Sequence, residues 1–458
     1  AVVRPRSILP LAGFVDELTP ATEAVSPGAL ILIARALLKE ANAWGPSART
    51  RGFLLAVTNT IGELDARGYS SADVRATASL VTDPPPEPAL FLDLFARVET
   101  ELAARGLVLQ SGRLRAATQT AFQKGIAPWR TLLVDGFFSF TEPELTLLNA
   151  FRRHAEVTIT LPDWPGAERA RHQLQQFGFE EETTKEAATP VDIDLVTAGG
   201  MEAEIGALCH RIIDEHQNGT PFRHMGIVLR EPEPYAAALK TALARFHIPA
   251  RFYFVSSLDD TPKFRYFEAL AAAARSGWDH ERVLSALAYQ TNGLGGTEAG
   301  DELEYAIRQR LPNSGLEPLL LLDSRFEPFN RFDHFWHQIA EPTQHAETLA
   351  ALMDEPDAPA KAAQALRPGP MTGAEFWDEF AALSSFTPVR DHDQRRDVVH
   401  VIDVYEARQW RLPVVFVPGM LEGRFPKHGF DDPLFPDKFR QRLVELGLPV
   451  RTLAERQV

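Results

Sequence analysis

The stretch LLVDGFFSFTEPELTLL, residues 132–148, decides the fold class, because an apolar run is followed directly by a helix-start signal. The leucine and valine residues predict a buried strand. Thr141 and Glu144 have the spacing of a capping box, which marks the first turn of a helix. VTITLP, residues 157–162, predicts a second strand. A strand, a helix and a strand in this order indicate a parallel sheet covered by helices.

A second α/β unit is expected further along the chain. Its predicted strands are DIDLVTA, HMGIVLR and ARFYFV, and its predicted helices begin at Met201 and Pro234. Two more strands, around a short helix or turn, are expected within residues 398–420. The sequence between these blocks has helical periodicity, so we expect a helical insertion from which the chain returns to the sheet at residue 398.

The expected organisation has five parts. Residues 1–125 are a helical region, 126–190 the remainder of a first α/β domain, 191–265 the first half of a second, 266–395 a helical insertion and 396–458 the return segment. Two proline-rich stretches are predicted to lie outside helices: DPPPEP, residues 83–88, as a linker, and residues 354–370 as a mobile connection.

Composition limits the classes of function. Hydrophobic residues make up 45% and the net charge is −15, which argues against an open surface that binds DNA regardless of sequence. Residues 401–458 hold nine Lys and Arg against eight Asp and Glu, so contact with a polyanion is expected there or in a locally basic groove. A single cysteine, Cys209, excludes a disulfide framework or a four-cysteine metal site in this chain and fits a reducing, cytoplasmic setting. No stretch is apolar and long enough to predict a membrane span or a signal peptide.

Asp135 ends its predicted strand where nucleotide-driven motors place a magnesium-binding acid, and the alternative is an ordinary strand whose Asp begins a turn. Gly136 stands where such motors carry a second acid to activate water, and glycine offers no base. The sequence contains no G-x-x-x-x-G-K-[ST] phosphate loop. We therefore expect no ATP binding of that kind.

Two longer segments resemble superfamily 1 helicases of the UvrD/RecB type. Residues 224–252 are similar to the helicase segment "diavLxR…l…al…gIPy", with Arg230 at its basic position. Residues 398–426 resemble "V-x-x-m-T-x-H-x-A-K-G-L-E-F-x-x-V-F-x-x-G-x-x-E-G-x-F-P". The matching positions are Val399, Ala407, Val415, Phe416, Gly419, Glu422, Gly423, Phe425 and Pro426. The polar positions differ: Asp403 replaces Thr, Tyr405 replaces His, Arg408 replaces Lys, Gln409 replaces Gly and Arg411 replaces Glu.

This combination is similar to the inactivated, helicase-like B subunit of AddAB-type helicase–nucleases, also called RexB, and more distantly to RecC. The resemblance implies two RecA-like parallel-sheet domains with helical insertions, and a partner motor subunit of the AddA/RecB type. It also implies a role in DNA double-strand-break repair and recombination without ATP hydrolysis by this chain. We further expect a fragment of a longer protein, without the nuclease domain and its iron–sulfur cluster, and thus no cofactor here.

The resemblance also implies site residues. The nucleotide-site remnants would be Asp135, Gly136, Arg230 and Arg411, and the DNA contacts would be Tyr405, Arg408, Arg424 and Lys427. Two alternatives stay open, an active ATP-dependent helicase or exonuclease subunit and a protein–protein scaffold with no nucleic-acid role. For the trio Asp391, His392 and Asp393, a solvated loop is favoured over a metal site, and for RFYF, residues 251–254, a core position is favoured over base stacking.

Overall fold

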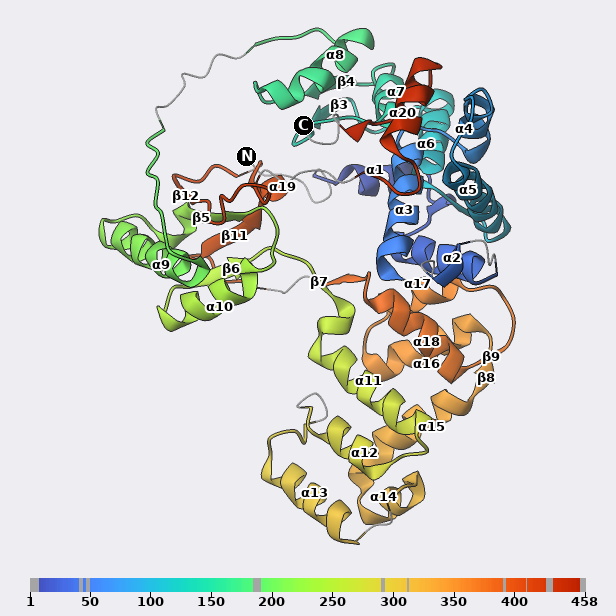
Figure 1. Ribbon diagram of the computed structural model, residues 1–458, viewed down its shortest axis with the longest axis vertical. Coiled ribbons are helices and arrows are strands. Elements are labelled where there is room, and N and C mark those ends of the chain that lie inside the picture. The colour runs from blue at the N-terminus through green and yellow to red at the C-terminus, as the bar shows by residue number, and fades with distance from the viewer. Residues whose placement is uncertain are drawn as a thin grey trace.

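The computed structural model describes residues 8–40, 44–46, 50–183, 191–289, 293–310, 313–389, 393–408, 410–425 and 431–453. It is an α/β protein in which helices predominate and the main sheets are small and parallel (Figure 1). Among the described residues, no helix combines the length and apolar character that crossing a membrane requires.

The N-terminal region is mostly helical, as expected. Its elements are α1 (Leu11–Leu18), β1 (Glu23–Ala24), α2 (Pro27–Glu40), α3 (Arg51–Ala66), α4 (Ser71–Ala78), α5 (Pro86–Ala104), β2 (Leu107–Val108) and α6 (Gln110–Lys124). The expected linker at 83–88 is shorter than predicted, because α5 already begins at Pro86. Proline is accepted in a first helical turn, where its missing N–H would have no intrahelical partner.

The first α/β unit contains the strand and helix predicted from residues 132–148. It consists of β3 (Thr131–Val134), α7 (Glu142–Phe151), β4 (Glu156–Ile159) and α8 (Glu168–Gln176). Strands β3 and β4 pair in parallel, with Leu132 opposite Val157. The capping box is confirmed, since Thr141 accepts from the Glu144 backbone N–H and the Glu144 carboxylate accepts from that of Thr141.

The second unit is a four-stranded parallel sheet in the order β12-β5-β11-β6. Its elements are α9 (Met201–Gln217), β5 (Met225–Leu229), α10 (Tyr235–Arg245), β6 (Ala250–Phe252), β11 (Val399–Asp403), α19 (Val404–Ala407) and β12 (Val414–Phe416). Strand β11 lies between β5 and β6, so the chain does return to this sheet after the helical insertion. The expected strand DIDLVTA is wrong. Residues 191–198 form no regular secondary structure and pair with no described strand, and Ile193 and Leu195 are 79% and 89% exposed.

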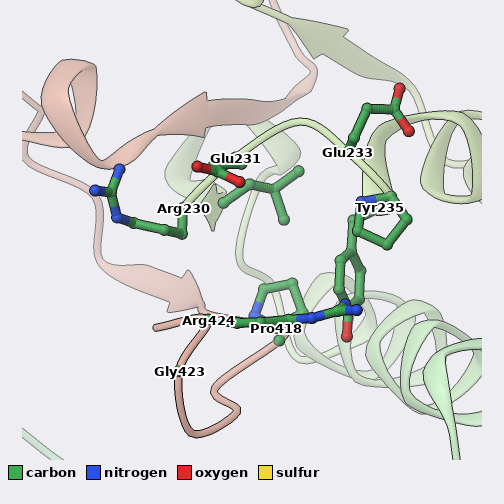
Figure 2. A pocket seen from close by; sticks show the side chains of 10 residues that line it. Arg230, Glu231, Glu233, Tyr235, Pro418, Gly423 and Arg424 are labelled. Atoms are coloured by element: carbon green, nitrogen blue, oxygen red, sulfur yellow. The ribbon is translucent and has the colours of Figure 1, made fainter. Parts of the chain in front are cut away.

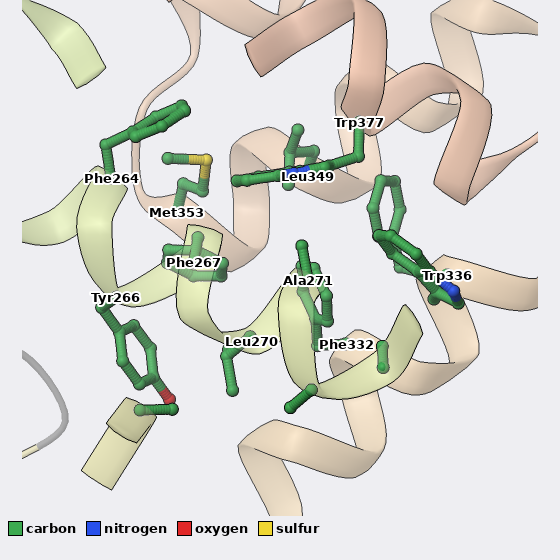
Figure 3. Packing of buried hydrophobic residues seen from close by; sticks show 14 of the residues in the cluster. Phe264, Tyr266, Phe267, Leu270, Ala271, Phe332, Trp336, Leu349, Met353 and Trp377 are labelled. Carbon is green, nitrogen blue, oxygen red and sulfur yellow. The ribbon is translucent and has the colours of Figure 1, made fainter. Parts of the chain in front are cut away.

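The helical insertion lies below the second sheet in Figure 1. Its elements are β7 (Ser256–Ser257), α11 (Pro262–Arg275), α12 (His280–Leu287), α13 (Glu298–Arg310), α14 (Leu316–Leu322), α15 (Glu327–His337), β8 (Ile339–Ala340), α16 (Pro342–Met353), α17 (Asp357–Ala365), β9 (Met371–Thr372), α18 (Gly373–Ser384) and β10 (Pro388–Val389). An aromatic core that includes Phe264, Phe332 and Trp377 joins α11, α15 and α18 (Figure 3). The mobile connection expected at 354–370 is wrong, because α17 buries Ala358 and Ala362 in this core.

The return segment expected at 396–458 contributes to two cores. Val399 and Val401 of β11 pack in one core with α9 and α10, which cover this face of the second sheet. The last helix, α20 (Asp437–Glu445), instead buries Phe439 and Leu443 among the N-terminal helices α2, α3 and α5.

Candidate functional site

The carboxyl ends of β5 and β11 mark the point where the chain connections of the second sheet diverge. The connection from β5 passes through α10 to β6, whereas the connection from β11 returns through α19 to β12. Right-handed crossovers place these two connections on opposite faces of the sheet. Helix α10 covers one face. The Leu412 side chain lies on the other face, so close to Gly226 that a Cβ added there would be only 2.3 Å from Leu412 Cδ1. Open α/β sheets bind ligands at such a divergence of connections.

Three polar or aromatic residues predicted from the sequence meet at this point. The guanidinium of Arg230, directly after β5, lies 5.7 Å from the centre of the Tyr405 ring, and the guanidinium of Arg408 lies 5.1 Å from it. Asp403 caps α19 by accepting hydrogen bonds from the backbone N–H groups of Tyr405 and Glu406, both at 2.7 Å. The cap fixes the helix, yet the Tyr405 side chain stays 58% exposed.

Arg408 also reaches the first α/β unit. Its guanidinium lies 5.1 Å from the Phe138 ring centre and 5.6 Å from that of Trp164, which follow β3 and β4 respectively. The Phe138 and Trp164 rings are themselves in edge contact at 6.4 Å. We call Phe138, Trp164, Arg230, Tyr405 and Arg408 the arginine–aromatic cluster. It joins the carboxyl edges of both sheets, with exposed cation–π contacts that contribute about 0.5–1 kcal/mol each.

A pocket of about 360 Å³ adjoins the cluster at the carboxyl ends of β5 and β12. Figure 2 shows Arg230 pointing away from Tyr235, while the Arg424 side chain extends towards the Tyr235 ring. The Glu204 carboxylate accepts hydrogen bonds from the Tyr235 hydroxyl at 2.5 Å and from the Gly419 backbone N–H at 2.9 Å. The pocket lining thus includes two guanidinium groups, of Arg230 and Arg424, and two carboxylates, of Glu231 and Glu233.

The remaining predicted residues lie apart from this cluster or outside the described residues. Asp135 follows β3 and accepts a hydrogen bond from the Thr160 hydroxyl at the end of β4, which gives it a structural role. Arg411 is exposed and is not among the residues that line the pocket. Lys427, Gln409, Asp391 and His392 lie outside the described residues. Asp393 pairs with Arg395, and the described residues include no group of three or more His, Cys, Asp or Glu that could hold a metal ion.

Gly136 has a conformational role that the sequence did not reveal. Its φ is +83°, a left-handed conformation that costs a residue with a side chain about 1–2 kcal/mol. We therefore expect Gly136→Glu to destabilise the protein by about that amount and to produce no ATP hydrolysis. Chemical denaturation and a phosphate-release assay with single-stranded DNA measure the two effects. ATP hydrolysis by this variant would show that the site retains a working motor.

Sequence reasoning missed a buried histidine on β11. His400 contacts the Tyr253 hydroxyl through Nδ1 at 2.9 Å and the Arg223 carbonyl through Nε2 at 3.2 Å, and the Trp410 ring lies 4.5 Å from its own. The carbonyl can only accept, so Nε2 carries the proton and Nδ1 accepts from Tyr253. Tyr253 and His400 thus lie on the face opposite α10, while Phe252 and Phe254 pack towards the core, in part as predicted for RFYF. The sequence signal that could have revealed His400 is the alternation of side chains between the two faces of the sheet along β11.

We expect His400 to make stability depend on pH. Burial lowers its pKa below the ordinary value of 6.5. The unfolded chain therefore takes up a proton at higher pH than the folded one. The stabilisation by neutral His400 is complete above about pH 6.5 and is lost as pH falls through the lower folded pKa. His400→Gln, whose amide can donate to the carbonyl and accept from Tyr253, should show a shallower loss of stability below pH 6.5. Equal acid sensitivity of both proteins would contradict this.

Trp164 and Glu204 were also missed as site residues. Trp164 lies in a loop without periodicity, and Glu204 was noted only as part of the helix start MEAEI. The fold and site together define an α/β protein in which two small parallel sheets meet through an exposed arginine–aromatic cluster. No family model matches the chain, and no curated protein does so either.

Proposed function

We propose that this chain is a helicase-like subunit that binds single-stranded DNA at the arginine–aromatic cluster and does not hydrolyse ATP. In this proposal the two α/β units are RecA-like domains, and the chain works beside an AddA/RecB-like motor subunit in processing broken DNA ends. The observation that carries the proposal is the cluster itself, because its side chains come from the carboxyl edges of both sheets.

The chemistry of the cluster suits single-stranded nucleic acid. Unpaired bases stack on aromatic faces whatever their sequence, and arginine binds phosphates and also stacks on bases. Trp164 and Tyr405 are 40% and 58% exposed, so both rings are accessible to a base. Arg230, Arg408 and Arg424 supply positive charge at this edge, beside the Glu231 and Glu233 carboxylates of the pocket lining. A chain of net charge −15 needs such local positive charge in order to bind a polyanion.

The same site offers little to ATP. The sequence has no phosphate loop, Asp135 is hydrogen-bonded to Thr160, and the position of the water-activating acid is a glycine with a left-handed backbone. We therefore propose that the helicase-like framework is retained for binding DNA and the partner, and that the motor subunit supplies the energy.

A titration tests this function. Fluorescein-labelled oligothymidylate and a labelled duplex are titrated with the chain at two salt concentrations, and anisotropy is measured. We expect binding of the single strand that weakens as salt rises, because phosphate contacts release counterions. ATP hydrolysis stimulated by the oligonucleotide would instead support the active helicase.

A role confined to protein assembly is the second candidate, and the acidic net charge favours it. It predicts no binding of either DNA at low salt in the same titration. Absence of binding would therefore overturn the DNA role of this chain and favour a role in protein assembly.

A further inference from the structure

Glu204 connects three elements around the pocket. It lies in the first turn of α9, and its carboxylate holds Tyr235, the first residue of α10, and Gly419, in the segment after β12. Burial and the hydrogen bond with Glu204 raise the pKa of Tyr235 to about 12, so its hydroxyl remains a donor at every physiological pH. Hydrogen bonds to an ionised carboxylate are stronger than those between neutral groups.

Gly419 lies directly against the Tyr235 ring. A Cβ added to Gly419 would lie 3.0 Å from Tyr235 Cε2, and the φ of Gly419 is +75°. Both observations favour glycine at this position. The segment after β12 is therefore held against α10 by close packing as well as by the Glu204 carboxylate.

Backbone hydrogen bonds in the turns after Gly419 connect Gly419 to Arg424. The Leu421 N–H donates to the Gly419 carbonyl at 2.8 Å, and the N–H groups of Arg424 and Phe425 donate to the Leu421 carbonyl at 3.0 and 2.9 Å. The backbone of Arg424 is thus connected to the residue that Glu204 holds. Its exposed side chain extends across the pocket towards Tyr235 (Figure 2).

We propose that Glu204 is a positioning residue of the DNA site: it fixes the segment 417–425 so that Arg424 contacts a phosphate of the bound strand. This inference rests on the proposed function. Glu204 then favours the binding of a polyanion by positioning Arg424, although its negative charge alone would oppose that binding.

The direction in which DNA affinity changes when Glu204 is replaced tests the proposal. Glu204→Ala removes one negative charge and both hydrogen bonds, whereas Glu202→Ala removes the same charge from an exposed neighbour in the same helical turn. With labelled oligothymidylate, we expect Glu204→Ala to weaken binding several-fold and Glu202→Ala to leave it unchanged or slightly tighter. The slope of log affinity against log salt should fall by about one for Glu204→Ala, as one phosphate contact is lost.

Glu204→Gln is the rescue variant. Its amide can accept from the Gly419 N–H and donate to the Tyr235 oxygen, so it should regain most of the affinity although it lacks the charge. Hydrogen exchange of the amides of residues 419–425, measured without DNA, should be faster in Glu204→Ala than in Glu202→Ala. Thermal unfolding of each variant identifies any variant that has not folded.

The outcomes separate the two proposals. If the unmodified chain does not bind oligothymidylate, the proposed function fails. If it binds, and Glu204→Ala binds as tightly as Glu202→Ala or shows unchanged amide exchange, the positioning role of Glu204 is wrong.

Discussion

Replacing Arg440 by alanine is expected to destabilise the protein by about 3–5 kcal/mol, the usual cost of removing one partner from a buried ion pair. The Arg440 side chain is 1% exposed, and its guanidinium forms ion pairs with Glu63 and Asp432, both at 2.6 Å. It also donates to the Phe435 and Arg451 carbonyls. Alanine would remove this ion pair from Asp432, which is itself buried.

Arg442 is the matched control for this prediction. It lies on the same helix, is 68% exposed and pairs with Glu445 on the surface. Exposed pairs of this kind contribute about 0–1 kcal/mol. Urea denaturation of Arg440→Ala and Arg442→Ala should therefore give clearly different free energies of unfolding. Similar values for the two variants would show that the buried network does not hold α20 in place.

This network has a consequence for how the molecule is organised. Glu63 belongs to α3 and Asp432 to the segment before α20, so Arg440 ties the end of the described chain to the N-terminal helices. The same chain passes through β12 of the second sheet shortly before. The chain between β12 and α20 therefore connects the second sheet to the helical region.

Local signals predicted much of the fold. The capping box at Thr141, the β-branched runs of β5 and β11 and the helix from Met201 were all readable, because caps and side-chain periodicity depend on neighbouring residues. Residues 191–198 show the limit of such signals. Their alternation is typical of a strand, but a strand forms only where another strand pairs with it. The prediction for the Ala- and Pro-rich α17 was wrong in the opposite direction. Its composition did not predict a helix, but packing against α2 and α16 stabilises one.

The candidate site was predicted only in part. Arg230, Tyr405 and Arg408 were singled out by their positions in the two segments that resemble superfamily 1 helicases, and the structure brings them together at the carboxyl ends of β5 and β11. Phe138 and Trp164 come from the other α/β unit, more than two hundred positions away from Tyr405 in the chain. No local pattern reports how two units are oriented. The contacts of Arg408 with both rings therefore became visible only in the structure.

Trp164→Ala is expected to weaken the binding of oligothymidylate about 5- to 150-fold, since a base–aromatic stack contributes about 1–3 kcal/mol. Phe122→Ala is the matched control. Phe122 is 41% exposed against 40% for Trp164 and also contacts an arginine, Arg153 at 4.7 Å, but it lies at the end of α6, outside the cluster. Its loss should leave the affinity unchanged.

Salt dependence then separates stacking from charge within the cluster. Trp164 is neutral, so Trp164→Ala should lower affinity by the same factor at every salt concentration and leave the slope of log affinity against log salt unchanged. Arg408→Ala should reduce that slope by about one, because it removes a phosphate contact. If Trp164→Ala and Phe122→Ala bind equally well, no base stacks on the cluster. If Trp164→Ala instead changes the slope, its ring acts by orienting Arg408, whose guanidinium it contacts, and the bound strand meets the cluster through its phosphates rather than its bases.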